Sequence, residues 1–178
     1  MKLEIGPGDC PLIGWDTLDS VAWPGVTPTH IAKWGSEPLP IPSNTYDLVF
    51  SSHTIEHIPW MDVEAAVGEV CRILKPGGIF ECWTIDFEVI IKAYLEREIP
   101  DDWDCHQMVK CPTDWCAARL YAYPKHGLDS MWHRSLFDRR HLKAKLLEGG
   151  LINPFDLEKT RGHDHGVVNL GVGAYKPL

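Results

Sequence analysis

Short apolar runs separated by turns predict a series of β-strands. Residues 2–6 read KLEIG and end in a Gly-Pro-Gly turn, and residues 14–19, GWDTLD, alternate along a second short strand. A third candidate covers 29–34. The segments YDLVFSS (46–52) and IFECWTI (79–85) are more continuously apolar, which indicates buried strands.

Apolar residues at helical spacing follow these strands. Within residues 61–74 they recur every three or four positions, and the Pro-Gly-Gly turn at 76–78 is expected to end that helix. Residues 87–98 and 138–150 predict two further helices. Segment 99–130 has no sustained period and is interpreted as an insertion, or lid, with short helical pieces.

Two closing strands, at 155–160 and 166–176, complete the alternation of strands and helices. The pattern predicts an α/β fold with a largely parallel sheet. Residues 37–47 contain three prolines and are expected to form a loop. With 178 residues and 44% hydrophobic content, residues 1–178 are most simply a single domain.

Composition narrows the class of protein. There is no apolar run of about 18 residues and no N-terminal signal-peptide pattern, which favours a cytoplasmic location without a membrane partner. The six cysteines form no CxxC pair, so reduced thiols are expected. A formal charge of −8 disfavours nucleic acid as the main partner, because proteins that bind its backbone usually carry a basic surface.

Residues 53–57, HTIEH, match the H-x-x-E-H pattern of a class of zinc metalloproteases. Such a site needs both histidines on one face of a long helix. Pro59 follows closely and biases the residue before it away from helical conformation, so a zinc hydrolase is disfavoured. The histidines of RGHDHGV (161–167) are likewise interpreted as solvated or acceptor-contacting, and no metal is predicted.

Four stretches in order resemble the class I S-adenosylmethionine-dependent methyltransferases, specifically the small type 11 family. LEIGPG resembles the family's acidic-x-Gly-x-Gly loop, and GWDTLD a second strand that ends in an acidic residue. LPIPSNTYDLVFSSHTIEHI resembles the proline-containing loop, fourth strand and His-containing turn, and EVCRILKPGGIF the next helix, turn and strand. The resemblance implies a Rossmann-like sheet, mostly parallel with an antiparallel C-terminal strand.

The resemblance also implies S-adenosyl-L-methionine as cofactor, bound beyond the C-terminal strand ends near the switch in strand order. Glycines at 6 and 8 let the backbone turn sharply and approach a ligand. A carboxylate at 19 can accept hydrogen bonds from both ribose hydroxyls. The expected cofactor-binding residues are Glu4, Gly6, Pro7, Gly8, Asp19, Trp34, Ser51 and His53, the last beside the methionine part.

Some of these residues have structural alternatives. Glu4 can bond amides of its own loop, and Asp19 can be a turn residue. Trp34 stands where the family often has an acidic residue, and either stacks on the adenine or belongs to the core. Only residues 9–13 separate the glycine turn from the second strand, so the first crossover helix is expected to be short or absent.

Methyl transfer is an in-line displacement, in which alignment supplies much of the acceleration and a base helps only for a hydroxyl-like acceptor. The candidate catalytic residues are His53, Asp86 and His133, although Asp86 can instead cap a helix and His133 can simply bond the backbone. Aromatic residues in 99–133 are expected to form a wall of the acceptor pocket, or else a small subdomain or dimer contact.

The leading prediction is an S-adenosylmethionine-dependent methyltransferase that acts on a small-molecule or sugar acceptor. The alternative is a catalytically silent S-adenosylmethionine-binding accessory or regulatory protein, which the short first crossover and the missing third-strand acid favour. The sequence starts at its first predicted strand, without the N-terminal helices that often cover the cofactor in this family. Either the insertion at 99–130 or a second protomer is therefore expected to cover it. A homodimer is left open.

Overall fold

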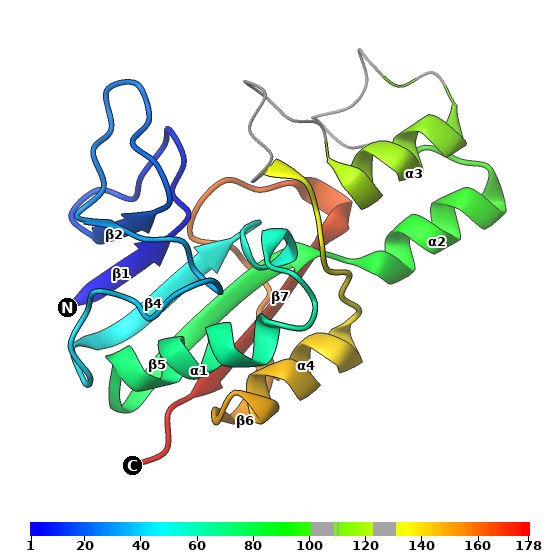
Figure 1. Ribbon diagram of the computed structural model, residues 1–178. Coiled ribbons are helices and arrows are strands. Elements are labelled where there is room, and N and C mark those ends of the chain that lie inside the picture. The colour runs from blue at the N-terminus through cyan, green and yellow to red at the C-terminus, as the bar shows by residue number, and fades with distance from the viewer. Residues whose placement is uncertain (101–108, 110, 123–130) are drawn as a thin grey trace.

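The computed structural model describes residues 1–100, 109, 111–122 and 131–178, and within them a seven-stranded sheet has the order β3-β2-β1-β4-β5-β7-β6 (Figure 1). Neighbours from β3 to β5 are parallel, whereas β7 runs antiparallel to both β5 and β6. This confirms the expected sheet. The strands are β1 (Lys2–Ile5), β2 (Asp16–Asp19), β3 (His30–Ile31), β4 (Tyr46–Ser52), β5 (Leu74–Ile85), β6 (Ile152–Asp156) and β7 (Asn169–Tyr175).

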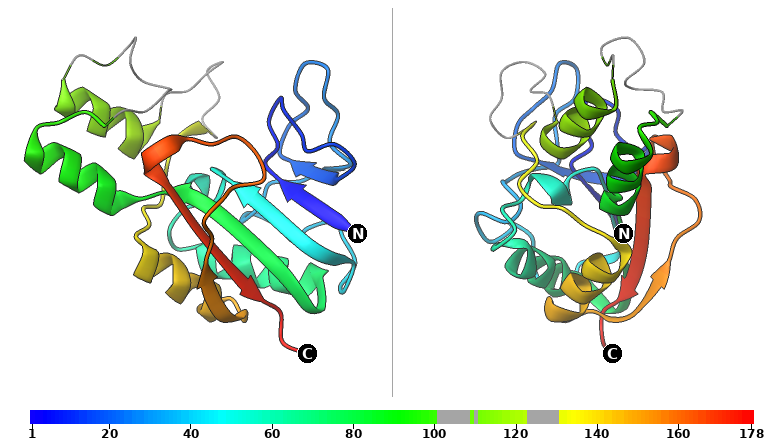
Figure 2. Two further views of the ribbon diagram at one scale, coloured as in Figure 1. Left: turned by 180° about the vertical axis from the view of Figure 1, so that it is seen from behind. Right: turned by 90° about the vertical axis from the view of Figure 1, so that its right-hand side faces the viewer.

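Helices cover the sheet unevenly. Helices α1 (Val63–Ile73) and α4 (Arg139–Glu148) lie together on one face, and α2 (Phe87–Glu96) and α3 (Pro112–Tyr121) pack on each other beyond the end of β5 (Figures 1 and 2). Single 3₁₀ turns are η1 (Ile55–His57) and η4 (Gly166–Val168). Over the described residues, loops rather than helices cross the opposite face of the sheet (Figure 2).

The alternation of side chains along the strands explains this asymmetry. Leu3, Val49 and Phe80 are fully buried in the main core, beneath α1 and α4. Their neighbours point to the other face, where the Phe50 ring meets Trp15 edge-on at 6.2 Å between centroids and Glu81 pairs with a guanidinium from the loop after β6. That face is closed by a few aromatic and charged contacts.

The first crossover confirms the expectation of a short or absent helix. Residues 6–15 connect β1 to β2 without a helix, and the Gly6 amide donates to the Leu18 carbonyl at 2.8 Å. Because no helix stands here, the glycine turn packs directly on the end of β2. The backbone at this edge of the sheet is therefore held by strand-to-loop hydrogen bonds.

Two predicted boundaries are wrong. The strand expected at 155–160 is β6, Ile152–Asp156, whose exposed and half-buried side chains show little alternation. The helix expected to run to the Pro-Gly-Gly turn ends at Ile73 instead, because Leu74 already pairs with Tyr46 as the first residue of β5. An irregular register just beyond this pair accommodates the turn within the strand.

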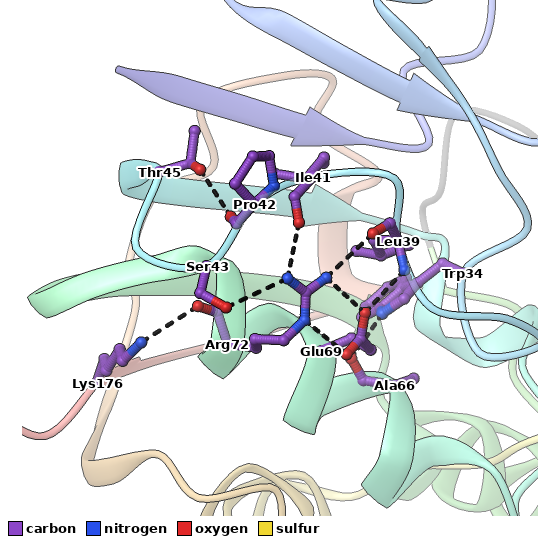
Figure 3. Close-up of polar contacts among 10 residues, drawn as sticks. All are labelled: Trp34, Leu39, Ile41, Pro42, Ser43, Thr45, Ala66, Glu69, Arg72 and Lys176. Carbon is purple, nitrogen blue, oxygen red and sulfur yellow. Dashed lines mark hydrogen bonds and ion pairs between the residues drawn. The ribbon is translucent and has the colours of Figure 1, made fainter.

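Helix α1 anchors the proline-rich loop before β4 (Figure 3). The Arg72 guanidinium donates to the Leu39 and Ile41 carbonyls at 3.1 and 2.7 Å, while Glu69 accepts from the Leu39 amide at 2.7 Å. One turn earlier on the helix, the Ala66 carbonyl accepts the indole N–H of Trp34 at 2.8 Å. These bonds hold residues 34–41 against α1. They thereby fix the position of Trp34 near the C-terminal ends of the strands.

Candidate functional site

A cavity of about 300 Å³ lies at the C-terminal ends of β1, β2 and β4, and its volume is at the lower end of the range for ligand pockets. Between β1 and β4 the strand order reverses direction, which is where open α/β sheets bind ligands. Charged and polar residues that border the cavity include Asp9, Asp19, Ser20, Lys33, His53, Thr54, His57 and Arg134.

The glycine turn forms one wall. Gly6 and Gly8 have φ angles of +72° and +60°, a region that side chains disfavour. A Cβ on Gly6 would lie 2.1 Å from the Thr54 hydroxyl, so this glycine is required by packing within the protein. A Cβ on Gly8 would meet no protein atom within 4 Å, and Gly8 borders the cavity. Open space at Gly8 suits a ligand that approaches the backbone.

Asp19 closes β2 at the edge of the cavity. Its Oδ1 accepts from the Ser20 amide at 2.6 Å, and its Oδ2 accepts from the Trp23 indole at 3.1 Å and the Gly8 amide at 3.3 Å. The carboxylate therefore organises the turn that precedes it and the loop that follows. Ser20 Oγ and the Val21 amide also lie 3.4 Å from Oδ1, so donors of the protein face all of the roughly four acceptor positions of the carboxylate, and a ligand hydroxyl would have to replace one of the longer bonds.

Three other expected cofactor residues lie outside the cavity lining. Glu4 is buried and accepts from the Leu12 amide at 2.7 Å, and its burial raises the pKa of the carboxyl group. Pro7 and Ser51 are also buried. Among the described residues, Ser51 Oγ has no hydrogen-bond partner. Glu4 thus bonds an amide of its own loop, as the structural alternative expected.

Trp34 borders the cavity but is only 6% exposed. Its indole N–H is bonded to α1, and its ring meets Phe80 edge-on at 6.1 Å between centroids. Most of the ring is therefore core, as one of the two interpretations expected. The small exposed part still contributes to the cavity wall.

His53 lies at the end of β4 with a φ angle of +50°, uncommon outside glycine and asparagine. Its Nδ1 is 3.2 Å from Glu56 Oε1, and its Nε2 is 2.8 Å from Asn169 Oδ1. The Asn169 amide nitrogen donates to Asp164 Oδ1 at 2.6 Å, which fixes the direction of the amide. Both ring nitrogens of His53 consequently face acceptors.

Glu56 is buried beneath this histidine, and Thr84 Oγ1 donates to its Oε2 at 3.0 Å. Burial would raise the pKa of Glu56, but the close contact and charge of His53 outweigh it and lower that pKa to about 2. For His53 the signs are reversed. Burial alone would lower the pKa of the imidazole, but the neighbouring Glu56 carboxylate raises it by more, so the net shift is upward. Both shifts favour the charged forms, an imidazolium beside a carboxylate, although the 3.2 Å contact has the geometry of an ion pair and not of a hydrogen bond.

Three more histidines surround this ion pair. The His165 ring lies 3.9 Å from the His53 ring, and burial together with the charge of His53 lowers the pKa of His165 to about 3. His133 Nδ1 lies 2.9 Å from the Arg119 carbonyl, and its ring is 4.8 Å from that of His57. We refer to His53, Glu56, His57, His133 and His165 as the histidine cluster.

Sequence analysis missed His57 as a site residue. His57 borders the cavity, and its Nδ1 is 3.3 Å from the Trp132 carbonyl. The Glu-His pair of the H-x-x-E-H motif was the available signal. In the structure, those residues occupy the single turn η1, and the Glu56 carboxylate contacts His53.

The remaining candidates fall elsewhere. Asp86 caps α2, because its carboxylate accepts a hydrogen bond from the Glu88 amide at 2.9 Å. Neither Asp86 nor His133 borders the cavity. Trp115, expected at the acceptor wall, is fully buried in a second core between α2 and α3. Other aromatic and histidine residues expected there lie outside the described residues: Trp103, His106, Tyr123 and His126.

Comparisons with known proteins agree with this geometry. Residues 25–82 match the family model of a methyltransferase domain. The chain is 51% identical over 43 residues to the uncharacterized protein YafE of Escherichia coli, which is 24% of this chain and 20% of that protein. It is 33% identical over 61 residues to the ubiquinone/menaquinone biosynthesis C-methyltransferase UbiE of Rickettsia massiliae, 34% of this chain and 23% of that protein.

Similarity of fold extends over the whole chain. A SAM-dependent methyltransferase from Methanosarcina mazei superposes with a TM-score of 0.57 at 15% identity, over 99% of this chain and 92% of the other. These two curated relatives are matched over less than a quarter of their own length. The resemblance to class I S-adenosylmethionine-dependent methyltransferases is confirmed: the chain has their fold, and residues 25–82 match the methyltransferase domain.

Proposed function

We propose that this chain binds S-adenosylmethionine in the cavity between β1, β2 and β4 and transfers its methyl group to a small-molecule acceptor. The observation that carries the proposal is the pairing of Gly8 and Asp19 on the cavity wall, at the reversal in strand order. The open space at Gly8 fits a ligand that approaches the backbone, and the long bonds from the Gly8 and Val21 amides to Asp19 are ones that ribose hydroxyls can replace.

The cofactor supplies an electrophilic methyl group on a sulfonium. The residues of the chain supply binding and alignment, which account for much of the acceleration in such displacements. Asp19 holds hydroxyl groups through charge-assisted hydrogen bonds, and the glycine turn admits the ligand close to the backbone. Glu56 and Asn169 hold the two ring nitrogens of His53 and so fix the position of the ring where it borders the cavity.

The acceptor class rests on relatives and on the site together. UbiE of Rickettsia massiliae is a C-methyltransferase of quinone biosynthesis, which favours a small organic acceptor over a macromolecule. A sugar acceptor remains within the proposal, since the segment that contains Trp132 and His133 contacts His57, which borders the cavity. No helix in the described part of the chain is long and apolar enough to span a membrane.

The cofactor assignment is tested by a matched pair of glycine substitutions. Gly8 and Gly14 both have positive φ angles, +60° and +78°, and a Cβ on either meets no atom within 4 Å. Only Gly8 borders the cavity. We expect Gly8→Val to abolish calorimetric binding of S-adenosylhomocysteine while Gly14→Val, under similar backbone strain, keeps it. Equal binding by both variants would show that the turn has no ligand role.

A silent cofactor-binding protein is the second candidate. It is supported by the first crossover, where no helix stands between β1 and β2 and one side of the cofactor cavity has only the glycine turn. Tight binding of S-adenosylhomocysteine without methylation of any acceptor in a broad panel would favour this candidate over the enzyme.

A further inference from the structure

Helix α2 carries apolar side chains on two of its faces. Ile90 and Ala93 are buried in the second core, against α3. On the side away from that core, Phe87, Ile91 and Leu95 follow one another at a spacing of four residues, and Ile91 and Leu95 are 40% and 71% exposed. Since a surface helix normally has one apolar stripe that faces its own core, the second stripe is available to another surface.

A groove of about 440 Å³ is bordered by this second stripe, which we call the apolar row. The groove is also bordered by a charged row one position further along the helix, Glu88, Lys92 and Glu96, and by Asp138. Among the described residues, no ion pair is formed by the three side chains of the charged row, although their spacing would allow pairs along the helix. An apolar row and a row of alternating charges therefore lie side by side.

The position of α2 leaves this surface accessible. Helices α2 and α3 project beyond the end of the sheet and pack on each other, and the C-terminal end of α2 is the part of that helix farthest from the sheet (Figures 1 and 2). Leu95, with its 71% exposed surface, stands near that end. The C-terminal half of α2 is therefore the part best placed to meet another molecule.

We propose that α2 is an interaction surface for a second copy of this chain, and that two α2 helices pair antiparallel through this groove. A two-fold axis perpendicular to the helices presents the same patch of each copy to the other. It sets apolar row against apolar row and charged row against charged row. A parallel pair would set each apolar row against a charged row, so the arrangement of the rows favours the antiparallel direction.

The charges select the register of the pair. When the pair is centred at residue 94, Lys92 of each copy lies level with Glu96 of the other. In the same register, Ile91 of one copy lies two residues, about 3 Å along the axis, from Leu95 of the other. A pair centred at residue 92 would instead set Lys92 against Lys92. Complementary charges and the apolar contact therefore coincide at the exposed end of α2.

The size of the contact predicts a weak association. Interfaces that bury less than about 1,200 Å² belong to weak or transient complexes, and one pair of ten-residue helices falls in that class. We therefore expect a reversible dimer whose population rises with concentration. The inference does not depend on the proposed function.

Helix α3 connects this surface to the candidate site. It packs on α2, and its Tyr121 carbonyl accepts the His133 amide at 3.2 Å, while its Arg119 carbonyl lies 2.9 Å from His133 Nδ1. The His133 ring in turn contacts His57 at the border of the cavity. A second copy on α2 therefore steadies the same insertion that supports this part of the cavity border.

A solvated helix face is the competing explanation. Single exposed leucines are common on protein surfaces, and Lys92 can pair with Glu96 of its own helix in solution. A helix of a different protein with apolar anchors and matching charges is a further alternative. The explanations differ in one respect, because only pairing between copies needs Lys92 of one chain to meet Glu96 of another.

Sedimentation velocity of the whole chain tests the surface. We expect wild type to pass from monomer to dimer between about 10 μM and about 1 mM. Leu95→Glu removes the apolar contact and should weaken association at least about tenfold without changing the melting temperature, because the side chain is exposed. Leu147→Glu is the control and should associate like wild type, because Leu147 is 49% exposed on α4 and does not border the groove.

Two results of that experiment would overturn the proposal. A wild type that stays monomeric throughout the range would leave the groove to a different partner or to solvent. Equal association of wild type and Leu95→Glu would show that the copies meet through another face.

Charge reversal tests the partner and the register together. Lys92→Glu makes both positions 92 and 96 acidic, and Glu96→Lys makes both basic, so copies of either variant repel one another and should remain monomeric. Mixed in equal amounts, with one of them fluorescently labelled, the two variants should form heterodimers, since opposite charges then meet at both positions. Pairing along a single helix cannot produce this result. Dimers of either variant alone, or a mixture that stays monomeric, would overturn the antiparallel pairing through Lys92 and Glu96.

Discussion

At the Gly8–Asp19 end of the cavity, the groups that face the ligand come from one short stretch, residues 6–23. At the other end, His53 is bonded to Asn169, 116 positions further along the chain. The first end is built from backbone amides and one carboxylate, and it is adapted to holding a ligand. The second is a buried ion pair with further histidines around it, and its organisation controls where protons sit.

The difference between the two ends predicts different consequences of substitution. Removing a group from the glycine turn should weaken binding and leave the fold intact, because that end is held by exposed loop bonds. Removing a member of the buried ion pair should destabilise the protein first, because the remaining charge loses its partner.

The largest effect is expected for Glu56→Ala. Deleting one partner of a buried ion pair leaves an uncompensated charge, here on His53, and typically costs about 3–5 kcal/mol. Urea unfolding near neutral pH measures this loss. Glu148→Ala is the control, because Glu148 pairs with Lys145 on the exposed side of α4, and surface pairs contribute about 1 kcal/mol or less. Equal losses in the two variants would contradict the assignment of an ionised pair.

A dependence of stability on pH follows from the same carboxylate. The pKa of Glu56 is lowered to about 2, so its contribution is complete above the unfolded value of 4.5 and is lost as the pH falls toward 2. The expected loss is on the order of 3 kcal/mol. The unfolding free energy of wild type minus that of Glu56→Gln should shrink across this window. Parallel curves for the two proteins would show that Glu56 is not the responsible group.

That Gly6, Gly8 and Asp19 lie together at one end of the cavity could be predicted from sequence, because the signals are local. Gly6, Gly8 and Asp19 belong to two adjacent motifs, and the buried strand and helix around residues 46–74 have strong apolar patterns. The role of Asn169 could not be predicted, since nothing in residues 161–169 indicates which histidine it meets. Glu56 was visible only as part of an apparent zinc motif, and its partner depends on the single turn η1.

Asp19→Ala tests the ligand-binding end directly. Losing a charge-assisted pair of hydrogen bonds should cost ~1.5–3 kcal/mol, which weakens calorimetric binding of S-adenosylhomocysteine by roughly ten- to a hundredfold. Asp19→Asn retains an acceptor of the same shape without the charge and should lie between wild type and alanine. Unchanged affinity of Asp19→Ala, with a normal melting temperature, would show that Asp19 only organises its own loop.

The smallest effect is expected for Trp34→Phe, at a residue that borders the cavity but lies mostly in the core. The indole N–H donates to the Ala66 carbonyl in the core, and phenylalanine removes this bond while it keeps most of the buried ring. The expected cost is about 1 kcal/mol of stability, measured by urea unfolding, with S-adenosylhomocysteine affinity changed less than about twofold. Because only 6% of the Trp34 surface is exposed, a ring that mainly packs the core should affect folding more than binding. A tenfold loss of affinity with unchanged stability would reverse that order and indicate that Trp34 contacts the adenine.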